Sequence, residues 1–599
     1  MGLSDRPMAR DGVRRLTVIA RDAASGRWRI FERPIEIIVA RNVDDVVPAL
    51  EKIEHACVHE DRHAAGFIAY EAAPAFDSSL KTHAAADFPL LWFGLYAAVE
   101  ERTLENLGPA PRALPGEIWV PSISEEEYAE IFERLQELIR SGDTYQVNYT
   151  YRIRTRLQAD PLALFLRLAA EPSPPFAAYV DTGEWAICSA SPELFFHRAG
   201  ERVESRPMKG TAPRGLWFEQ DLEYARRLRD SEKERSENVM IVDMVRNDLG
   251  RVARPGSVRV TSLFDVERYP TVLQLTSTVA ADTDASLVSV MRAMFPAASI
   301  TGAPKARTME IIADIERSAR RIYTGTIGFI EPGGRSQFNV AIRTVLVHRA
   351  TGEAEYGVGG GIVAGSSRAD EWAESKIKAR ALAAQPPSFD LLETVLWKPD
   401  DGYLLLGRHL KRLLQSSDYF GFRVDVLDVR DQLEQYATRL PPHPHRVRLV
   451  VSRSGSVQIT ATPHDVEAGF APLAMAARPI DPANPFLYHK TTNRGVYEDA
   501  IAGRPGFEDV LLHNDRGEVT ESTIANVVVE KHGVLLTPPI SSGLLPGTLR
   551  AHLLDDGKIQ EEVITVQDIA DGVPCFLLNS VRGFHPVTVD YRSVSTVPS

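Results

Sequence analysis

Cysteine is scarce in this chain, and the cysteines that are present lie far apart. The 599 residues include three of them, Cys57, Cys188 and Cys575, and no two form a C-x-x-C pair. A disulfide framework or a zinc knuckle needs regularly spaced cysteines, so both are disfavoured. This usage is typical of the reducing cytoplasm, which is the location that we predict.

Long apolar runs and an excess of positive charge are also missing. No apolar stretch approaches the length of a membrane span, and the basic N-terminal residues are not followed by the apolar core of a signal peptide. The formal net charge is −13, which argues against a nucleic-acid or anionic-membrane surface. We therefore expect neither nucleic acid nor membrane as a partner.

The remaining composition is that of a globular protein, with 44% hydrophobic and 25% charged residues. A chain of this length exceeds a single core, so two or more domains are expected. Strand and helix patterns alternate, and the segment 383–388, AAQPPS, has the composition of a linker. The sequence predicts an α+β fold in two regions, 1–385 (with parts 1–118 and 119–382) and 386–599.

Several local elements follow from the residue pattern. Short apolar segments predict strands at 28–31, 34–39, 66–70, 90–96, 389–397 and 403–406. Ser124 and Glu127 form a capping-box pattern that begins a helix running to about Ile139. Further helices are predicted at 231–244 and 408–417.

The stretch Arg206–Thr211 places a single lysine, Lys209, between a proline and a glycine. Proline fixes φ, and glycine allows close approach of the backbone to a ligand. A lysine held in this way can be a nucleophile if it is kept uncharged, but an isolated lysine in a turn is more often simply solvated. The neighbouring motifs decide between the two interpretations.

Carboxylates recur along the first region. Glu193 follows a predicted strand, Glu237 lies on a predicted helix, and Glu371 and Glu374 share a helix face. Carboxylates from different helices that face one cleft can hold Mg²⁺, a hard cation that prefers oxygen ligands. The alternative for Glu371 and Glu374 is a solvated face paired with Lys376 and Lys378. Likewise, 359–361, GGG, can be an anion site or a tight turn.

Taken together, these motifs resemble the chorismate-utilising enzymes from about residue 120 to 382. The matching segments are GDTYQVN (142–148), SPEL (191–194), RPMKGT (206–211), ENVMIVDMVRNDLG (237–250), SITGAPKARTMEII (299–312), FNVAIR (338–343), GGGIV (359–363) and DEWAESKIKARAL (370–382). The resemblance implies a two-layer fold of antiparallel sheet and helix that binds chorismate over Mg²⁺.

The resemblance also implies roles for individual residues. Glu237 and Glu374 are then metal ligands, with Glu371 nearby or acting through water. Arg343 and Tyr323 bind the enolpyruvyl carboxylate, Arg343 through a bidentate pair. The further substrate-binding groups that it implies are the backbone of Gly360 and Gly361 together with Gly210 and Thr211.

Three positions indicate the branch of this family. Lys209 stands where anthranilate and isochorismate synthases usually have alanine, and Asn238 where anthranilate synthases usually have histidine. Gln146 replaces the water-activating lysine of the isochorismate and salicylate synthases. All three positions are similar to aminodeoxychorismate synthase component I, and Met208 for the usual isoleucine is a size-conserving departure.

The implied chemistry explains Lys209. Chorismate exchanges its 4-hydroxyl for a 4-amino group with retention, which two successive allylic displacements achieve. The Lys209 amine adds at C2 while Glu193 protonates the departing hydroxyl, and ammonia then adds at C4 and expels the lysine. Desolvation with nearby Mg²⁺ and arginine charge favours a neutral amine, whereas Glu193 needs a raised pKa to carry its proton.

The ammonia must have a source. A glutaminase needs a nucleophilic cysteine in a Gly-rich elbow with a histidine and an acid, and none of the three cysteines has that setting. A separate glutamine amidotransferase subunit, or free ammonium, is therefore expected to supply it.

Beyond the linker, residues 389–586 resemble the fold-type IV pyridoxal-phosphate enzymes, which include the branched-chain and D-amino-acid transaminases and aminodeoxychorismate lyase. The resemblance rests on RHLKRL (408–413), YHKTTNR (488–494), GEVTES (517–522) and LPGTLR (545–550). By it, Lys490 is the Schiff-base lysine, and Glu521 holds the pyridine nitrogen protonated. Arg412, Thr548 and Leu549 form the phosphate cradle.

Fusion to the first region favours the lyase, because its substrate is the product expected of Lys209 chemistry. Lys490 would take the C4 proton, and aromatisation to 4-aminobenzoate would drive the loss of pyruvate. The Gly-Asp-Gly stretch that usually precedes Phe-Glu-Thr is missing before Leu392-Glu393-Thr394. A transaminase acting on another amine and a non-catalytic scaffold therefore stay open, as does a homodimer through this region.

Overall fold

The computed structural model of the chain describes residues 16–85, 87–108, 118–170, 174–380, 382, 387–465 and 469–591. The chain divides into two compact units, each described by itself. The first comprises residues 1–212 and 227–386, and the second 213–226 and 387–599. The predicted linker 383–388 lies mostly outside the described residues, so the domain boundary there stays a prediction.

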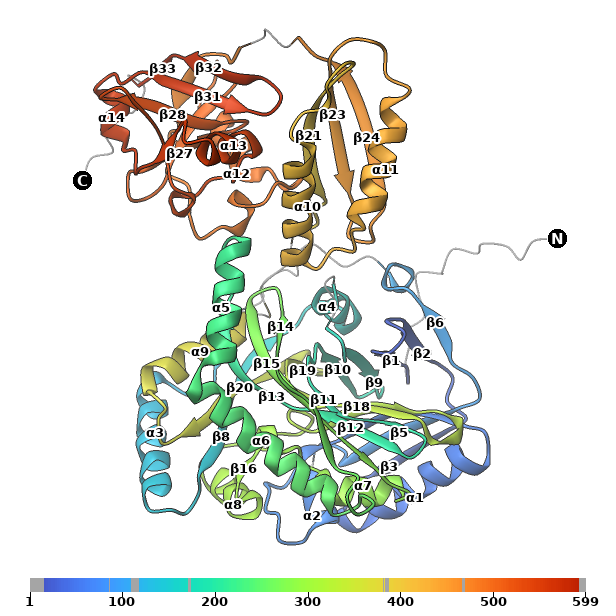
Figure 1. The fold of residues 1–599 in the computed structure, drawn as a ribbon. Helices are drawn as coiled ribbons and strands as arrows, with labels where there is room; N and C mark the ends of the chain where they lie inside the picture. Colours follow the sequence, from blue (N-terminus) through green and yellow to red (C-terminus); the bar gives the residue numbers. More distant parts are fainter. Residues whose placement is uncertain are drawn as a thin grey trace, which may run out of the picture. The chain divides into compact units, whose positions relative to one another are not determined.

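The first unit is built on two large, largely antiparallel sheets (Figure 1). The first sheet has the strand order β16 (Gly302–Ala303), β8 (Gln146–Arg156), β20 (Glu353–Val363), β19 (Thr344–His348), β10 (Trp185–Ser189), β9 (Ala178–Asp181), β1 (Val18–Arg21), β2 (Trp28–Phe31) and β6 (Glu100–Arg102), with β7 (Val120–Pro121) beside β8. The second has the order β13 (Met208–Pro213), β15 (Val272–Asp282), β12 (Arg202–Arg206), β11 (Leu194–Ala199), β18 (Ser336–Asn339), β17 (Thr326–Ile330), β4 (His63–Ile68), β5 (Leu91–Tyr96) and β3 (Glu36–Ala40), with β14 (Arg259–Arg268) beside β15.

Buried side chains join the two sheets and cover their outer faces. One core cluster contains Phe31 and Ile187 of the first sheet with Phe67 and Phe329 of the second, so the two sheets pack face to face. Two further clusters join each sheet to helices. These helices are α1 (Val43–His59), α2 (Ala73–Phe76), α3 (Glu125–Arg140), α4 (Pro161–Leu168), α6 (Glu232–Gly250), α7 (Leu287–Met294), α8 (Lys305–Ile315) and α9 (Arg368–Arg380).

The second unit contains a small sheet and a larger one. The small sheet has the order β22 (Gly402–Tyr403), β21 (Leu391–Lys398), β23 (His445–Val451) and β24 (Val457–Pro463), and helices α10 (Leu406–Phe420) and α11 (Val426–Ala437) pack on it. The larger sheet has the order β30 (Gln560–Glu561), β29 (Val534–Thr537), β28 (Asn526–Lys531), β27 (Val519–Ser522), β26 (Val510–His513), β25 (Leu473–Met475) and β33 (Val589–Asp590), with β31 (Cys575–Asn579) and β32 (Gly583–Val587) continuing from β28. Helices α12 (Gly495–Ala502), α13 (Thr548–Asp555) and α14 (Val566–Ala570) accompany it.

Helix α10 turns a polar but buried face toward the rest of its unit. His409, Arg412, Ser416 and Tyr419 are all buried and recur every three or four residues, the spacing of one helix face. The helix begins after Leu405, whose φ of 53° lies in the left-handed region and turns the chain sharply. This turn explains why the predicted strand 403–406 is wrong: the strand ends at Tyr403, and Leu406 already belongs to the helix.

Most of the other local predictions are confirmed. The capping box that begins α3 is present, because the Ser124 hydroxyl accepts from the Glu127 N–H at 3.2 Å and the Glu127 carboxylate accepts from the Ser124 N–H at 2.9 Å. The α+β class is confirmed in both units. The helix predicted at 231–244 continues to Gly250 as α6. Among the described residues, no helix is long and apolar enough to cross a membrane.

A buried ion pair supports the strand β8, against which β20 is aligned from Glu353–Arg156 to Val363–Gln146. The guanidinium of Arg320 donates to both carboxylate oxygens of Glu316 at 2.7 and 3.0 Å and to the carbonyl oxygen of Asn148 at 2.7 Å. Glu316 also accepts from the backbone N–H and the hydroxyl of Thr150. The pair therefore holds β8 in place from the chain that follows α8.

We predict that Arg320→Met lowers the free energy of unfolding by about 3–5 kcal/mol, because it removes the bidentate partner of the buried Glu316 carboxylate and leaves only the longer pair with Arg152, at 3.7 Å. Arg317→Met is the matched control. Arg317 pairs with Glu127 at the surface, where such pairs contribute about 0–1 kcal/mol. Urea unfolding of the two variants measures the difference, and equal losses would contradict this account of the network.

Candidate functional sites

Lys209 lies on β13, an edge strand, and its amine contacts a carboxylate from a helix. The distance from Lys209 Nζ to Glu237 Oε2 on α6 is 3.0 Å, and both side chains are largely buried. Asn238, the next residue on α6, donates from its side chain to the Lys209 carbonyl oxygen at 3.1 Å and accepts from the Ser277 hydroxyl at 2.6 Å. Asn238 thus fixes the backbone that carries the lysine.

The glycines of β20 make room at the tip of Lys209. A Cβ atom on Gly361 would lie 2.8 Å from Lys209 Nζ and 3.3 Å from the side-chain amide of Gln146. A Cβ on Gly360 would lie 2.9 Å from a carboxylate oxygen of Glu371. The absence of side chains here leaves backbone beside the amine, as the anion-site interpretation of the glycine run requires.

Glu193 lies just before β11 and is shut away from water. Its Oε1 accepts from the Ser299 hydroxyl at 2.6 Å, and the backbone N–H of Met208, next to Lys209, is a further donor to it. Burial raises the pKa of Glu193 to about 7, although both hydrogen bonds act in the opposite direction. A raised pKa is the direction that a general acid working near neutrality needs.

The other predicted carboxylates are engaged by basic or hydroxyl groups. Glu374 pairs with Lys378 at 3.0 Å, as the solvated-face alternative expected, and Glu371 accepts from the Ser366 hydroxyl at 2.7 Å. Burial acts to raise the pKa of Glu371 and of Glu374, and the nearby Lys209 acts to lower both. Among the described residues, no group of three or more acidic, histidine or cysteine side chains is close enough to hold a metal ion as it stands.

Arg343 and Tyr323 lie in two loops, just before β19 and β17 respectively. Arg343, whose φ is 50°, lies with its guanidinium 5.4 Å from the ring centre of Tyr269. Tyr323 is buried under Arg152, 5.0 Å from its ring. Burial raises the pKa of Tyr356. The charge of Arg343 acts to lower this pKa, and Tyr323 acts to raise it, so both groups influence the Tyr356 hydroxyl.

Gly210 and Thr211 continue the lysine strand and are tied to β15. Gly210 has φ of +105°, a conformation that favours glycine, and its carbonyl oxygen accepts from Gln274 at 2.8 Å. The Thr211 hydroxyl contacts the other end of the Gln274 amide at 3.2 Å. These contacts hold the backbone that follows Lys209 but do not by themselves show a ligand.

In the second unit, Lys490 and Glu521 line a pocket together with Arg494, Tyr497 and Asn526. Burial lowers the pKa of Lys490 to about 8 and raises the pKa of Glu521 to about 8. Glu521 accepts from the Tyr497 hydroxyl at 2.9 Å and from the Asn526 amide at 3.2 Å. The amine and the carboxyl are therefore both poised to exchange protons near neutrality.

The predicted phosphate cradle lies around Arg412 on α10. Arg412 forms a bidentate pair with Glu393 at 2.8 and 2.7 Å, and its remaining nitrogen donates to the Pro546 carbonyl oxygen at 3.2 Å. Thr548 and Leu549 begin α13, whose N-cap Gly547 supplies no side-chain cap, so the first N–H groups of the helix are open to an anion. A lysine, a buried carboxyl and an arginine beside a helix N-terminus form a donor set that fits pyridoxal phosphate.

Sequence reasoning missed the residues that hold these groups in place. Ser299 lies in the SITGAPK motif but received no role, and neither did Tyr497 or Asn526, which fix Glu521. Glu393 was noted only as part of the shortened front of the second region, yet Arg412 and His409 hold its pKa at about 2 against the effect of burial. Such partners are brought together by the fold and leave no spacing signal along the chain.

Comparisons with known proteins give a family for each part of the chain. Residues 17–384 match the profile of the chorismate binding enzyme family, and residues 390–589 match that of class IV amino-transferases, which implies pyridoxal phosphate in the second unit. Aminodeoxychorismate synthase component 1 of Klebsiella aerogenes is 42% identical over 269 residues, which are 45% of this chain and 59% of that protein.

Relatives with another product are almost as similar. Anthranilate synthase component 1 of Streptomyces coelicolor is 40% identical over 291 residues, or 48% of this chain and 56% of that protein. The chain thus spans little more than half the length of these curated relatives. The crystal structure of anthranilate synthase component I from Streptococcus pneumoniae superposes with a TM-score of 0.52 at 24% identity, covering 64% of this chain and 95% of that one, and shows the shared fold. With the family profile matching more than half of its length, the chain belongs to the chorismate binding enzyme family.

Proposed function

We propose that the first unit is an aminodeoxychorismate synthase component I and the second an aminodeoxychorismate lyase, so that the chain makes 4-aminobenzoate from chorismate. The observation that carries the proposal is the pairing of a nucleophile with an acid: Lys209 stands on the strand whose Met208 N–H also contacts Glu193, the carboxyl with a pKa of about 7. Relatives named as aminodeoxychorismate synthases support the same assignment.

The geometry supports a displacement through Lys209. Its amine would add at C2 of chorismate as the C4–O bond breaks, and the proton held by Glu193 would leave with the hydroxyl as water. Ammonia then forms a bond at C4, and the bond from C2 to Lys209 breaks. Arg343, Tyr323 and the backbone of Gly360 and Gly361 would bind the substrate carboxylates.

We further propose that Glu237, Glu374 and Glu371 bind Mg²⁺ once substrate draws Lys209 and Lys378 away from them. Carboxylate oxygens from two helices are the ligands that Mg²⁺ prefers, and the ion would neutralise a carboxylate of the substrate. The present ion pairs at 3.0 Å show that each lysine stands where a cation is stabilised. The two lysines and the metal therefore compete for the same carboxylates.

The ammonia is proposed to come from a separate glutaminase subunit. All three cysteines are buried, and burial raises the pKa of the Cys57 thiol to about 12 and of the Cys575 thiol to about 11. A buried thiol of this kind is a poor nucleophile, which supports the expectation that glutamine is not hydrolysed by these residues.

In the second unit, bound pyridoxal phosphate would supply an electron sink. Lys490, with its pKa near 8, is placed to move the proton at C4 of aminodeoxychorismate, and Glu521 to share a proton with the ring nitrogen. Loss of pyruvate then leaves an aromatic ring. The shortened front of this unit keeps a transaminase with another amine substrate as the second candidate, and the retained Lys490, Arg412 and Glu521 argue against a mere scaffold.

For the synthase, we predict that Lys209→Ala retains chorismate binding but loses efficient amination. Lys209→Arg is the matched control, since it keeps a cation opposite Glu237 but has no nucleophilic amine. Mass spectrometry of the wild-type protein with chorismate should find an adduct on Lys209. Normal formation of aminodeoxychorismate by either variant would exclude covalent catalysis.

For the general acid, we predict that the rate of adduct formation falls as pH rises through about 7, because Glu193 loses its proton there. Ser299 stabilises the ionised form, so Ser299→Ala should raise the pKa of Glu193 and move this falling limb to higher pH, by about one pH unit. Ser257→Ala, which removes an exposed hydroxyl, should leave the profile unchanged. A limb that stays in place in Ser299→Ala would assign the titration to another group.

For the lyase, we predict that Lys490→Ala, supplied with chorismate, ammonium and pyridoxal phosphate, accumulates aminodeoxychorismate and releases no pyruvate. The visible absorption of the lysine-bound cofactor should also disappear. Lys398→Ala, which changes a lysine paired at the surface with Asp401, is the control. If the wild-type protein transaminates another amine and releases no pyruvate from aminodeoxychorismate, the second candidate replaces the lyase.

A further inference from the structure

The second unit contains a segment that the family profiles assign to the first. Residues 213–226 lie inside the span matched by the chorismate binding profile, 17–384, yet they group with residues 387–599 in the fold. The segment follows Lys209 by four residues and comprises a turn and most of helix α5 (Phe218–Asp230), drawn in green in Figure 1.

The turn is folded tightly on itself. Arg214 binds Asp221 through two nitrogens, at 2.7 and 3.2 Å, and the Gly215 N–H donates to the same carboxylate at 3.0 Å. A Cβ on Gly215 would lie 2.2 Å from the Asp221 nitrogen, so only glycine fits. Leu216 N–H donates to the Gln220 side chain at 2.6 Å. These bonds give the turn a fixed shape before any further contact.

The turn holds Tyr419, a buried residue of α10. Arg214 donates to the Tyr419 carbonyl oxygen at 2.8 Å and covers its ring at 4.3 Å, while the Tyr419 hydroxyl donates to the Gly215 carbonyl oxygen at 2.7 Å. Both ends of the tyrosine are thus fixed by two adjacent residues of the segment. A buried tyrosine with every polar group satisfied has one orientation.

Tyr419 in turn packs on the residue next to Lys490. Its ring stacks on His489 with a centroid distance of 4.2 Å, and the His489 Nδ1 atom contacts the Ser416 hydroxyl at 3.0 Å. Trp217 packs on Tyr488, the residue before His489, with a distance of 5.4 Å between the ring centroids. Leu216 and Trp217 also join the apolar cluster that contains Tyr488 and Tyr497. The segment therefore contacts both residues that precede Lys490 in the chain, one directly and one through Tyr419.

We propose that residues 213–226 are a positioning element of the pyridoxal-phosphate site, with Arg214 and Trp217 orienting Lys490 through Tyr419, His489 and Tyr488. The C-terminal region matched by the class IV profile is then an incomplete site without this part of the first family's sequence. The inference rests on the cofactor site of the proposed function but does not depend on whether that site performs elimination or transamination.

The test uses the full chain and measures cofactor binding rather than turnover. Trp217→Ala should weaken binding of pyridoxal phosphate about tenfold, which corresponds to ~1.4 kcal/mol. In the cofactor-free protein, hydrogen–deuterium exchange of the peptide 485–492 should increase. Amination of chorismate should be unchanged, because Trp217 packs in the apolar cluster of the second unit with Tyr488.

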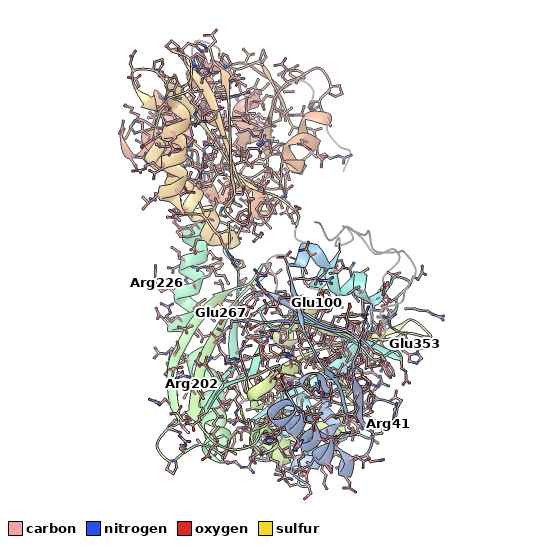
Figure 2. All side chains as sticks on the ribbon, turned by 90° about the vertical axis from the view of Figure 1, so that its right-hand side faces the viewer. Arg41, Glu100, Arg202, Arg226, Glu267 and Glu353 are labelled. Atoms are coloured by element: carbon pink, nitrogen blue, oxygen red, sulfur yellow. The ribbon has the colours of Figure 1, made fainter. Side chains whose placement is uncertain are left out.

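The matched control is Arg226→Ala, on helix α5 at the other end of the segment (Figure 2). Arg226 and its ion-pair partner Glu223 are exposed to solvent, where such pairs contribute little, so its removal should alter neither measurement. Tyr419→Phe, which removes a single hydroxyl, is the conservative second variant and should change both measurements in the same direction by less. Wild-type affinity and exchange in both Trp217→Ala and Tyr419→Phe would overturn the proposal, whatever reaction the site performs.

Discussion

Removal of ionisable side chains from water is the constraint on which both sites depend. A carboxyl at the start of β11 and another in the second unit's pocket have pKa values raised to about 7 and 8, and burial is the largest cause in each case. The same burial lowers the pKa of Lys490 to about 8. The sheets and helices that bury these three groups thus create acids and bases that work near neutral pH, which exposed glutamates and lysines do not.

Lys209 shows the complementary solution. Its charge is balanced by Glu237 on a neighbouring helix, and Asn238 fixes its backbone. The pair fixes the amine against a carboxylate, so the amine must be released before it can add to a substrate carbon. Under the proposed function, Mg²⁺ bound by Glu237, Glu371 and Glu374 would take the place of the amine beside Glu237.

The sequence predicted the chemistry-bearing residues better than their surroundings. Lys209 and Glu193 lie in short motifs with proline, Lys490 lies in the motif YHKTTNR (488–494), and the α+β class followed from the alternation of patterns. Ser299, Tyr497 and Glu393 were missed as partners, because a hydrogen bond between residues far apart in the chain depends on the fold and not on spacing. The boundary near residue 386 could not anticipate that residues 213–226 group with the second unit, since their local pattern of a turn and an amphipathic helix is the same in either setting. The strand predicted at 403–406 failed for a related reason: apolar residues there serve the start of α10 after the left-handed Leu405.

The central claim is that one chain carries chorismate through two successive reactions. The most direct measurement is product analysis of the purified protein with chorismate and ammonium, with and without pyridoxal phosphate. The account predicts aminodeoxychorismate alone when the cofactor is absent, and 4-aminobenzoate with an equal amount of pyruvate when it is present. Anthranilate as the product, or aminodeoxychorismate that persists unchanged with the cofactor bound, would contradict it.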